Sequence, residues 1–132
     1  MANLIDELRN EHRIMLDILD QVRLMGISSA TGQEKFLSIR DLLISHMKKE
    51  DEHYYPALMR EAEQNDALKL TLDYFARDME AVSRKAMQLF DKYAQGGAET
   101  EFSGDVKLLY MLLRDRIRIE EDTLFKKYGG DR

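Results

Sequence analysis

Apolar residues recur every three or four positions along most of the chain, and helix-breaking residues divide this pattern into four long segments. Such spacing places the apolar side chains on one face of an α-helix. The first segment begins at Asn3, a predicted N-cap, and ends at Gly26, a residue type that suits a helix C-terminus. Its apolar stripe consists of Leu8, Met15, Leu19 and Val22.

The second segment contains the single proline of the chain. Thr31, followed three residues later by Glu34, predicts a capping box at its start. Pro56 falls inside the apolar pattern, where the missing backbone N–H should bend the helix. The stripe of this segment comprises Phe36, Ile39, Leu42, Leu43, Met47, Tyr54 and Leu58.

Two further segments complete the pattern. Asn65 and Asp66 restart the chain into a third helix, which should end at Gln95-Gly96-Gly97, and the fourth runs from near Ser103 to Gly129-Gly130. The third stripe comprises Leu68, Leu72, Phe75, Met79, Val82, Ala86, Leu89 and Tyr93, and the fourth Val106, Leu109, Leu113, Ile117, Leu124 and Phe125. Four amphipathic helices joined by short links predict an all-α, up-down-up-down four-helix bundle.

Composition narrows the class of protein further. A length of 132 residues fits one domain, predicted to span 1–132. The chain has no cysteine, which excludes a disulfide framework and a thiolate metal site. With a net charge of -5, it lacks the basic surface that nucleic acid attracts, so we expect no nucleic-acid partner.

Neither a membrane span nor a secretory signal is expected. No segment approaches the roughly 20 apolar residues that a spanning helix requires. The opening residues Met-Ala-Asn-Leu-Ile-Asp-Glu-Leu become acidic at once, unlike the basic and then apolar start of a signal peptide. We therefore expect a cytoplasmic protein.

The two halves of the chain resemble each other over a short stretch of each pair of helices. His46-Met-Lys-Lys-Glu50 can be aligned with Arg116-Ile-Arg-Ile-Glu120. The corresponding positions are His12 and Met79, His46 and Arg116, and Glu50 and Glu120. This correspondence indicates that the first two helices and the last two form related pairs.

Polar side chains that interrupt an apolar stripe are the candidates for chemistry. His46 and Glu50 lie one helical turn apart, and His12 interrupts the first stripe. If the first two helices are antiparallel neighbours, these three side chains meet at one level, where a bundle can hold a metal ion. A hydrogen-bonded polar core is the alternative. Glu50-x-x-His53 also has the spacing found in ferritin-like di-iron bundles, although only one copy is present.

The segments Leu-Arg-Asn-Glu-His12 and His46-Met-Lys-Lys-Glu50-Asp-Glu-His-Tyr-Tyr-Pro56 resemble the first half of a hemerythrin-like (HHE cation-binding) domain. The resemblance covers essentially the whole chain in helix order and length. It implies a metal site whose ligands here are His12, His46, Glu50 and Glu120, with Glu121 as the alternative to Glu120. Members of the family hold a pair of irons through several histidines and bind dioxygen. This chain has three histidines, with Met79 and Arg116 where further ones are expected.

The resemblance with an incomplete ligand set predicts at most one metal ion, iron or another divalent cation. We expect a role in sensing, storage or regulation rather than oxygen carriage. No nucleophile, general base or oxyanion arrangement is discernible, so we do not expect an enzyme. The alternative is a metal-free structural or protein-interaction bundle in which Arg116 pairs with core carboxylates. A homodimer or a protein partner is compatible with either prediction.

Overall fold

The computed structural model describes residues 2–94 and 99–128, and helices account for almost all of them. Two of the four helical rods are uninterrupted: α1 (Ala2–Met25) and α4 (Asp66–Lys92). The second rod consists of α2 (Ala30–Lys49), the π-helical turn η1 (Glu50–Tyr54) and α3 (Tyr55–Ala62). The fourth consists of α5 (Glu99–Glu120), the π-helical turn η2 (Glu121–Phe125) and α6 (Lys126–Tyr128).

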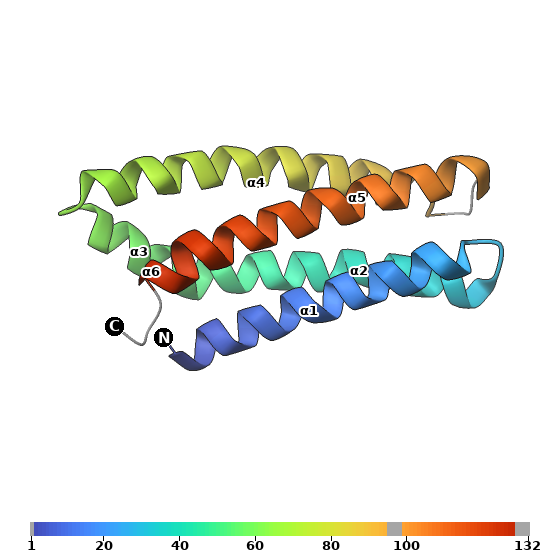
Figure 1. Ribbon diagram of the computed structural model, residues 1–132, viewed down its shortest axis with the longest axis horizontal. Coiled ribbons are helices and arrows are strands. Elements are labelled where there is room, and N and C mark those ends of the chain that lie inside the picture. The colour runs from blue at the N-terminus through green and yellow to red at the C-terminus, as the bar shows by residue number, and fades with distance from the viewer. Residues whose placement is uncertain (1, 95–98, 129–132) are drawn as a thin grey trace.

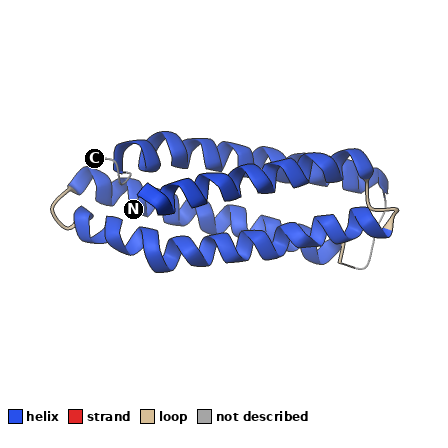
Figure 2. Ribbon diagram, turned by 90° about the horizontal axis from the view of Figure 1, so that it is seen from below, coloured by secondary structure: helices blue, strands red, loops and turns tan. Residues whose placement is uncertain are grey.

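The rods lie side by side and alternate in direction, which confirms the predicted up-down-up-down bundle (Figure 1). α1 packs against α2 and α5, while α4 packs against α3, α5 and α2. The start of α1 and the end of α6 therefore lie at the same end of the bundle (Figure 1). A quarter turn shows the same elongated arrangement (Figure 2). Within the described residues, no helix combines the length and the apolarity needed to cross a membrane.

The start of α2 differs from the prediction. Its N-cap is Ser29, whose Oγ accepts a hydrogen bond from the N–H of Gly32 at 3.1 Å, so the capping box at Thr31 and Glu34 is wrong. The reason is the turn before it. Gly26 has a φ of 75°, and a Cβ at Gly32 would lie 2.0 Å from the carbonyl oxygen of Gly26. The turn therefore packs against the first residues of α2, and the helix begins earlier than the sequence pattern indicates.

Some of the other predicted helix ends agree with the structure and some do not. Gly26 follows the last residue of α1, and the side chain of Asn65 caps α4 by accepting from the N–H of Leu68 at 3.1 Å. Asn3 is not a cap, since α1 already includes Ala2, and Ser103 lies inside α5 rather than at its start. The ends predicted at 95–97 and 129–130 lie outside the described residues.

The second and fourth rods each contain a π-helical turn. In η1 the N–H of Tyr55 donates to the carbonyl of Glu50, and Pro56 follows in the first turn of α3, where its missing N–H disrupts no interior bond. The predicted bend inside a regular helix is therefore replaced by a wider turn. The same turn occurs in η2, where Lys126 donates to Glu121 without any proline nearby. The proline is thus not required for it, and the turns extend the resemblance between the halves.

A layer of buried polar side chains divides the apolar core into two clusters. Ile5, Leu8, Tyr54, Leu58, Ala62, Leu68, Phe75, Leu124 and Phe125 form the cluster near the ends of the chain. The larger cluster lies beyond the layer and includes Met15, Leu19, Phe36, Leu43, Val82, Leu109 and Leu113. Each fully buried Leu or Phe contributes about 1.5–3 kcal/mol, and these clusters hold the polar layer in place.

Candidate metal centre

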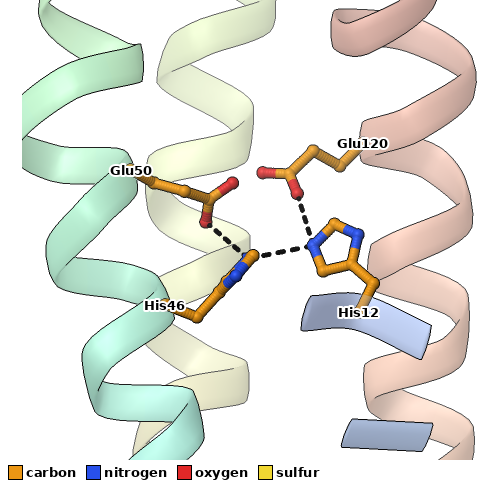
Figure 3. Close-up of side chains that lie close together, drawn as sticks. All are labelled: His12, His46, Glu50 and Glu120. Carbon is orange, nitrogen blue, oxygen red and sulfur yellow. Dashed lines mark hydrogen bonds and ion pairs between the residues drawn. The ribbon is translucent and has the colours of Figure 1, made fainter. Parts of the chain in front are cut away.

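The buried polar layer brings together four side chains from three rods. His12 comes from α1, His46 from α2, Glu50 from the start of η1, and Glu120 from the last position of α5. Their spacing of four residues puts His46 and Glu50 on one face of the second rod. All four are only 3–4% exposed. Figure 3 shows their side chains pointing toward one another.

One nitrogen or oxygen atom of each of the four residues lies within 4.8 Å of the others. The Nε2 atoms of His12 and His46 are 2.9 Å apart. His12 Nε2 lies 3.2 Å from Glu120 Oε1, and His46 Nε2 lies 3.3 Å from Glu50 Oε1. Ligands at about 2.0–2.2 Å from one ion are about 3 Å from their neighbours, so this spacing suits a single cation.

Two further carboxylates orient the imidazole rings. Glu121 Oε2 lies 2.7 Å from His12 Nδ1, and Glu11 Oε1 lies 2.7 Å from His46 Nδ1. Lys49 forms an ion pair with Glu11 and so holds that carboxylate in place. A carboxylate at Nδ1 favours the tautomer that carries its proton there. Each imidazole then directs the lone pair of Nε2 into the cluster, as in histidines that ligate metals.

The pKa values of the two carboxyl groups in the cluster are shifted in opposite directions. Burial, reinforced by the charge of Glu120, raises the pKa of Glu50 well above its usual range. Burial alone would also raise the pKa of Glu120, but hydrogen bonds to His12 and Glu50 hold it at about 2. The hydroxyl of Tyr55 also donates to Glu120, at 2.5 Å. The surroundings therefore favour the ionised form of Glu120 and the protonated form of Glu50.

The negative charge beside His12 affects the pKa of its imidazole. Burial would lower its pKa, but the hydrogen bonds to Glu120 and Glu121 outweigh burial and raise it. Within the described residues no N–H or O–H donor outside the carboxyl pair contacts Glu50 Oε2. A divalent cation would balance both carboxylates and supply a partner for that oxygen. The donor set thus fits one such ion.

Arg116 lies inside the bundle, as the apolar pattern of its helix allows, and is 5% exposed. Its partner is Asp78 on α4, with Nη1 and Oδ2 3.4 Å apart, and its guanidinium lies 4.2 Å from the ring centroid of Phe75. The predicted direct pairing with Glu50 or Glu120 is therefore wrong. Asp78 lies on α4, which packs beside α5, and its carboxylate lies within ion-pair distance of the guanidinium.

Two other candidates lie outside the four-residue cluster. Met79 on α4 is at the level of the cluster and only partly buried, and it packs against the larger apolar cluster. His53 is 63% exposed, with Nε2 3.8 Å from Glu52, so the Glu50-x-x-His53 spacing does not bring it to the site. A π-helical turn spans these residues, which rotates His53 away from the face it would occupy in a regular helix.

Sequence reasoning missed Glu11 and Asp78. Glu11 directly precedes His12, about 100° around the helix, at the edge of the face that enters the bundle. Asp78 likewise precedes Met79 in the stretch of α4 that aligns with α1. The signal that could have revealed both is an acidic residue next to each aligned position. Whether the side chain of such a residue points inward depends on how the rods pack.

The comparison with known families gives one match. Residues 3–128 match the family described as the hemerythrin HHE cation binding domain. The matched span includes the whole cluster and both residues, Met79 and Arg116, that stand at the corresponding positions of the second half. No curated protein and no solved structure matches the chain.

Proposed function

The chain belongs to the hemerythrin family, and from this premise we propose that its buried cluster binds one divalent cation, with iron as the first choice. The observation that carries the proposal is the convergence of two imidazole nitrogens and two carboxylate oxygens within 4.8 Å in the core. The ligands would be His12, His46, Glu50 and Glu120. Two neutral imidazoles and two carboxylates balance the charge of one divalent ion.

The second half of the polar layer supports a single ion rather than a pair. Arg116 stands where the first half has His46, and a guanidinium cannot ligate a metal. It lines the same inner cavity as the four donor side chains, so its positive charge opposes a second cation there. Met79 offers only a thioether, which is a poor ligand for hard cations.

Imidazole and carboxylate donors suit iron, manganese, zinc or nickel, and membership of the family favours iron. A bound iron would supply Lewis-acid and redox chemistry at this point of the core. The chain's own residues would bind the ion, orient its histidine ligands through Glu11 and Glu121, and shield it from bulk solvent. We propose a sensing, storage or regulatory role without catalysis, and no oxygen carriage.

Elemental analysis after anaerobic loading with Fe(II) tests the proposal. We expect one iron per chain, lost in His46→Ala and in Glu50→Ala because each removes a ligand. His53→Ala is the matched control, since His53 is exposed and should leave the iron content unchanged. Two irons per chain with an oxo-bridge absorption band would contradict a single-ion site.

A metal-free interaction module is the second candidate. One observation favours it: the ring nitrogens of His12 and His46 already lie within hydrogen-bond distance of protein atoms, and Arg116 is paired with Asp78. In that case loading with Fe(II), Mn(II) or Zn(II) should leave the melting temperature unchanged. A ligand that binds only the folded state raises the melting temperature, so a clear rise on loading rejects this candidate.

A further inference from the structure

The candidate ligands are closed off from solvent. Each is at most 4% exposed, and the inner cavity that they line has a volume of about 20 Å³, close to that of one water molecule. A hydrated divalent ion cannot reach this point unless part of the wall moves. The structure therefore has to provide an entry path if the site is to load.

A larger cavity of about 390 Å³ lies between the second rod and α4. Met47, Asp51 and Tyr55 line it from the second rod, and Leu72 and Phe75 line it from α4. It opens to solvent at exposed residues, among them Met59, Asp73 and Glu80. This outer cavity is thus accessible, whereas the inner cavity is not.

Met79 and Arg116 line both cavities. These two side chains therefore form the wall between the outer cavity and the candidate ligands. The other apolar walls of the inner cavity belong to the well-packed core, such as Met15, Leu43 and Leu113, which are 1–2% exposed. Displacing those side chains would open the core itself.

The polar contacts of the shared wall are long. The two polar contacts of Arg116, to Asp78 and to the Tyr55 hydroxyl, are 3.4 and 3.5 Å long, at the limit of a hydrogen bond. Its Nε has no partner within the described residues. Met79 is partly buried and unbranched, with three rotatable side-chain bonds. Met79 can move without breaking a polar contact, and Arg116 can move without breaking a polar contact shorter than 3.4 Å, although its guanidinium must leave the Phe75 ring.

The mouth of the outer cavity is acidic. Asp51, Asp73 and Glu80 are exposed lining residues. Glu80 is paired with Arg84 and the lining residue Arg116 with Asp78, so within the described residues the net charge of the lining comes from Asp51 and Asp73. A mouth with one sign of charge raises the local concentration and the association rate of oppositely charged ligands. The cavity therefore favours a divalent cation over an anion.

We propose that the outer cavity is the port through which a hydrated divalent cation enters and leaves the metal centre, with Met79 and Arg116 as its movable inner wall. This inference rests on the proposed function. It assigns a role to a cavity and to two residues that do not ligate the ion.

Stopped-flow loading with Co(II), and release into excess EDTA, test the port in the full chain. Met79→Ala should raise both rates about tenfold while the equilibrium Kd changes less than about threefold, because a gate alters the two rates equally. Met15→Ala is the matched control. Met15 lines the inner cavity but not the outer one, so its loss should leave the rates near those of the natural chain.

A second arm uses exposed side chains that are not needed for folding. The double variant Asp73→Asn/Glu80→Gln should slow loading about three- to tenfold at low salt, and added salt should shrink the difference. Asp17→Asn/Asp41→Asn removes the same charge from exposed positions outside the cavity and should have little effect.

The outcomes separate the two proposals. If neither the natural chain nor any variant binds Co(II) or Fe(II), the proposed function is rejected, and the proposed entry port is rejected with it. If the ion binds but Met79→Ala changes the rates no more than Met15→Ala, the port alone is overturned. Equal effects of the two charge-removing double variants would also overturn it.

Discussion

The two halves of the polar layer share a backbone feature, a π-helical turn, but differ in chemistry. Each half supplies one glutamate directly before or at the start of a π-helical turn. The first half adds two imidazoles, and the second adds a thioether and a guanidinium at the corresponding positions. The pairs are His12 with Met79, His46 with Arg116, and Glu50 with Glu120.

This comparison shows which features depend on metal ligands and which do not. The π-helical turn is present in both halves, although only one half has histidines. π-Helical turns occur often at functional sites because they change the direction of the residues around them. Here the turn positions a carboxylate in each half. On the proposed function, the side chains at the other two positions determine whether that half can bind an external cation or contains its own, Arg116.

The largest expected effect is a change in metal stoichiometry. The double variant M79H/R116H gives the second half the donors of the first and removes the buried positive charge. We expect two divalent ions per chain instead of one, measured by elemental analysis after anaerobic loading with Fe(II). Arg116→Met removes the charge without adding a ligand and should still bind one ion. A single ion in M79H/R116H would show that the two positions are not equivalent to His12 and His46.

The next largest effect concerns Arg116, the buried cationic side chain of the second half. Asp78→Ala leaves the guanidinium of Arg116 buried without its carboxylate, which should cost about 3 kcal/mol of unfolding free energy. Arg116→Met should cost much less, because it removes the charge and fills similar space. Urea denaturation of chelator-treated protein measures both. Asp91→Ala, an exposed position on the same helix, is the control.

If Asp78→Ala and Arg116→Met cost the same, the ion pair is not what stabilises this half. The double variant gives a further check. Adding Arg116→Met to Asp78→Ala should recover most of the lost stability, since no unpaired charge remains.

The two glutamates should respond in opposite ways to loss of their charge in the metal-free protein. Glu120 has a folded pKa of about 2, below its usual value of 4.5, so it contributes stability above pH 4.5 that is lost as pH falls toward 2. Glu120→Gln should therefore cost about 2 kcal/mol at pH 7, and the difference from the natural chain should narrow toward pH 4.

Glu50 has a raised folded pKa, so its contribution is present below pH 4.5 and is lost as pH rises through the folded value. Glu50→Gln resembles the protonated acid and should be as stable as the natural chain, or more stable, at pH 7. Chemical denaturation at pH 7 and at pH 4 measures both variants. A larger loss for Glu50→Gln than for Glu120→Gln would reverse the assignment of the ionised carboxylate.

The fold was predictable because the apolar spacing persists over each rod. The helix ends were less so. Ser29 and Thr31 are both good caps two residues apart, and the choice between them depends on the close contact of Gly26 with Gly32, which is not a local property. The π-helical turns also have no clear signal, since only one of them precedes a proline.

The site was predictable where polar residues interrupt an apolar stripe. His12, His46 and Glu50 do so, and the structure brings them together. Glu11 and Asp78 lie at the edge of their helical faces, and whether such residues point inward depends on the rotation of each rod. The partner of Arg116 could not be predicted for the same reason, because a long side chain can reach several neighbouring carboxylates.

A smaller effect is expected from the carboxylates that orient the histidines. Glu121→Gln and Glu11→Gln should each weaken metal binding about tenfold, or about 1.4 kcal/mol, because the imidazole loses its oriented, charged partner at Nδ1. Competition with a chelator of known affinity measures the change in Kd. Glu52→Gln, at an exposed glutamate of the second rod, should leave Kd unchanged.

The smallest effect concerns two aromatic residues at corresponding positions of the second and fourth rods. In the aligned halves Tyr55 corresponds to Phe125, and only the tyrosine has a hydroxyl, which donates to Glu120 at 2.5 Å and accepts from Arg116 at 3.5 Å. Tyr55→Phe should cost about 1 kcal/mol in the metal-free protein, the usual contribution of one hydrogen bond. Tyr74→Phe, at a 55% exposed ring, should cost nothing measurable.

The same hydroxyl helps to keep Glu120 ionised, although burial and the contacts to His12 and Glu50 have larger effects on its pKa. The loss in Tyr55→Phe should therefore be greatest at neutral pH and shrink as the solution is acidified toward the pKa of Glu120. A loss that does not depend on pH would mean that the ring acts by packing alone. In that case the hydroxyl would not link the carboxylate of one half to the cation of the other.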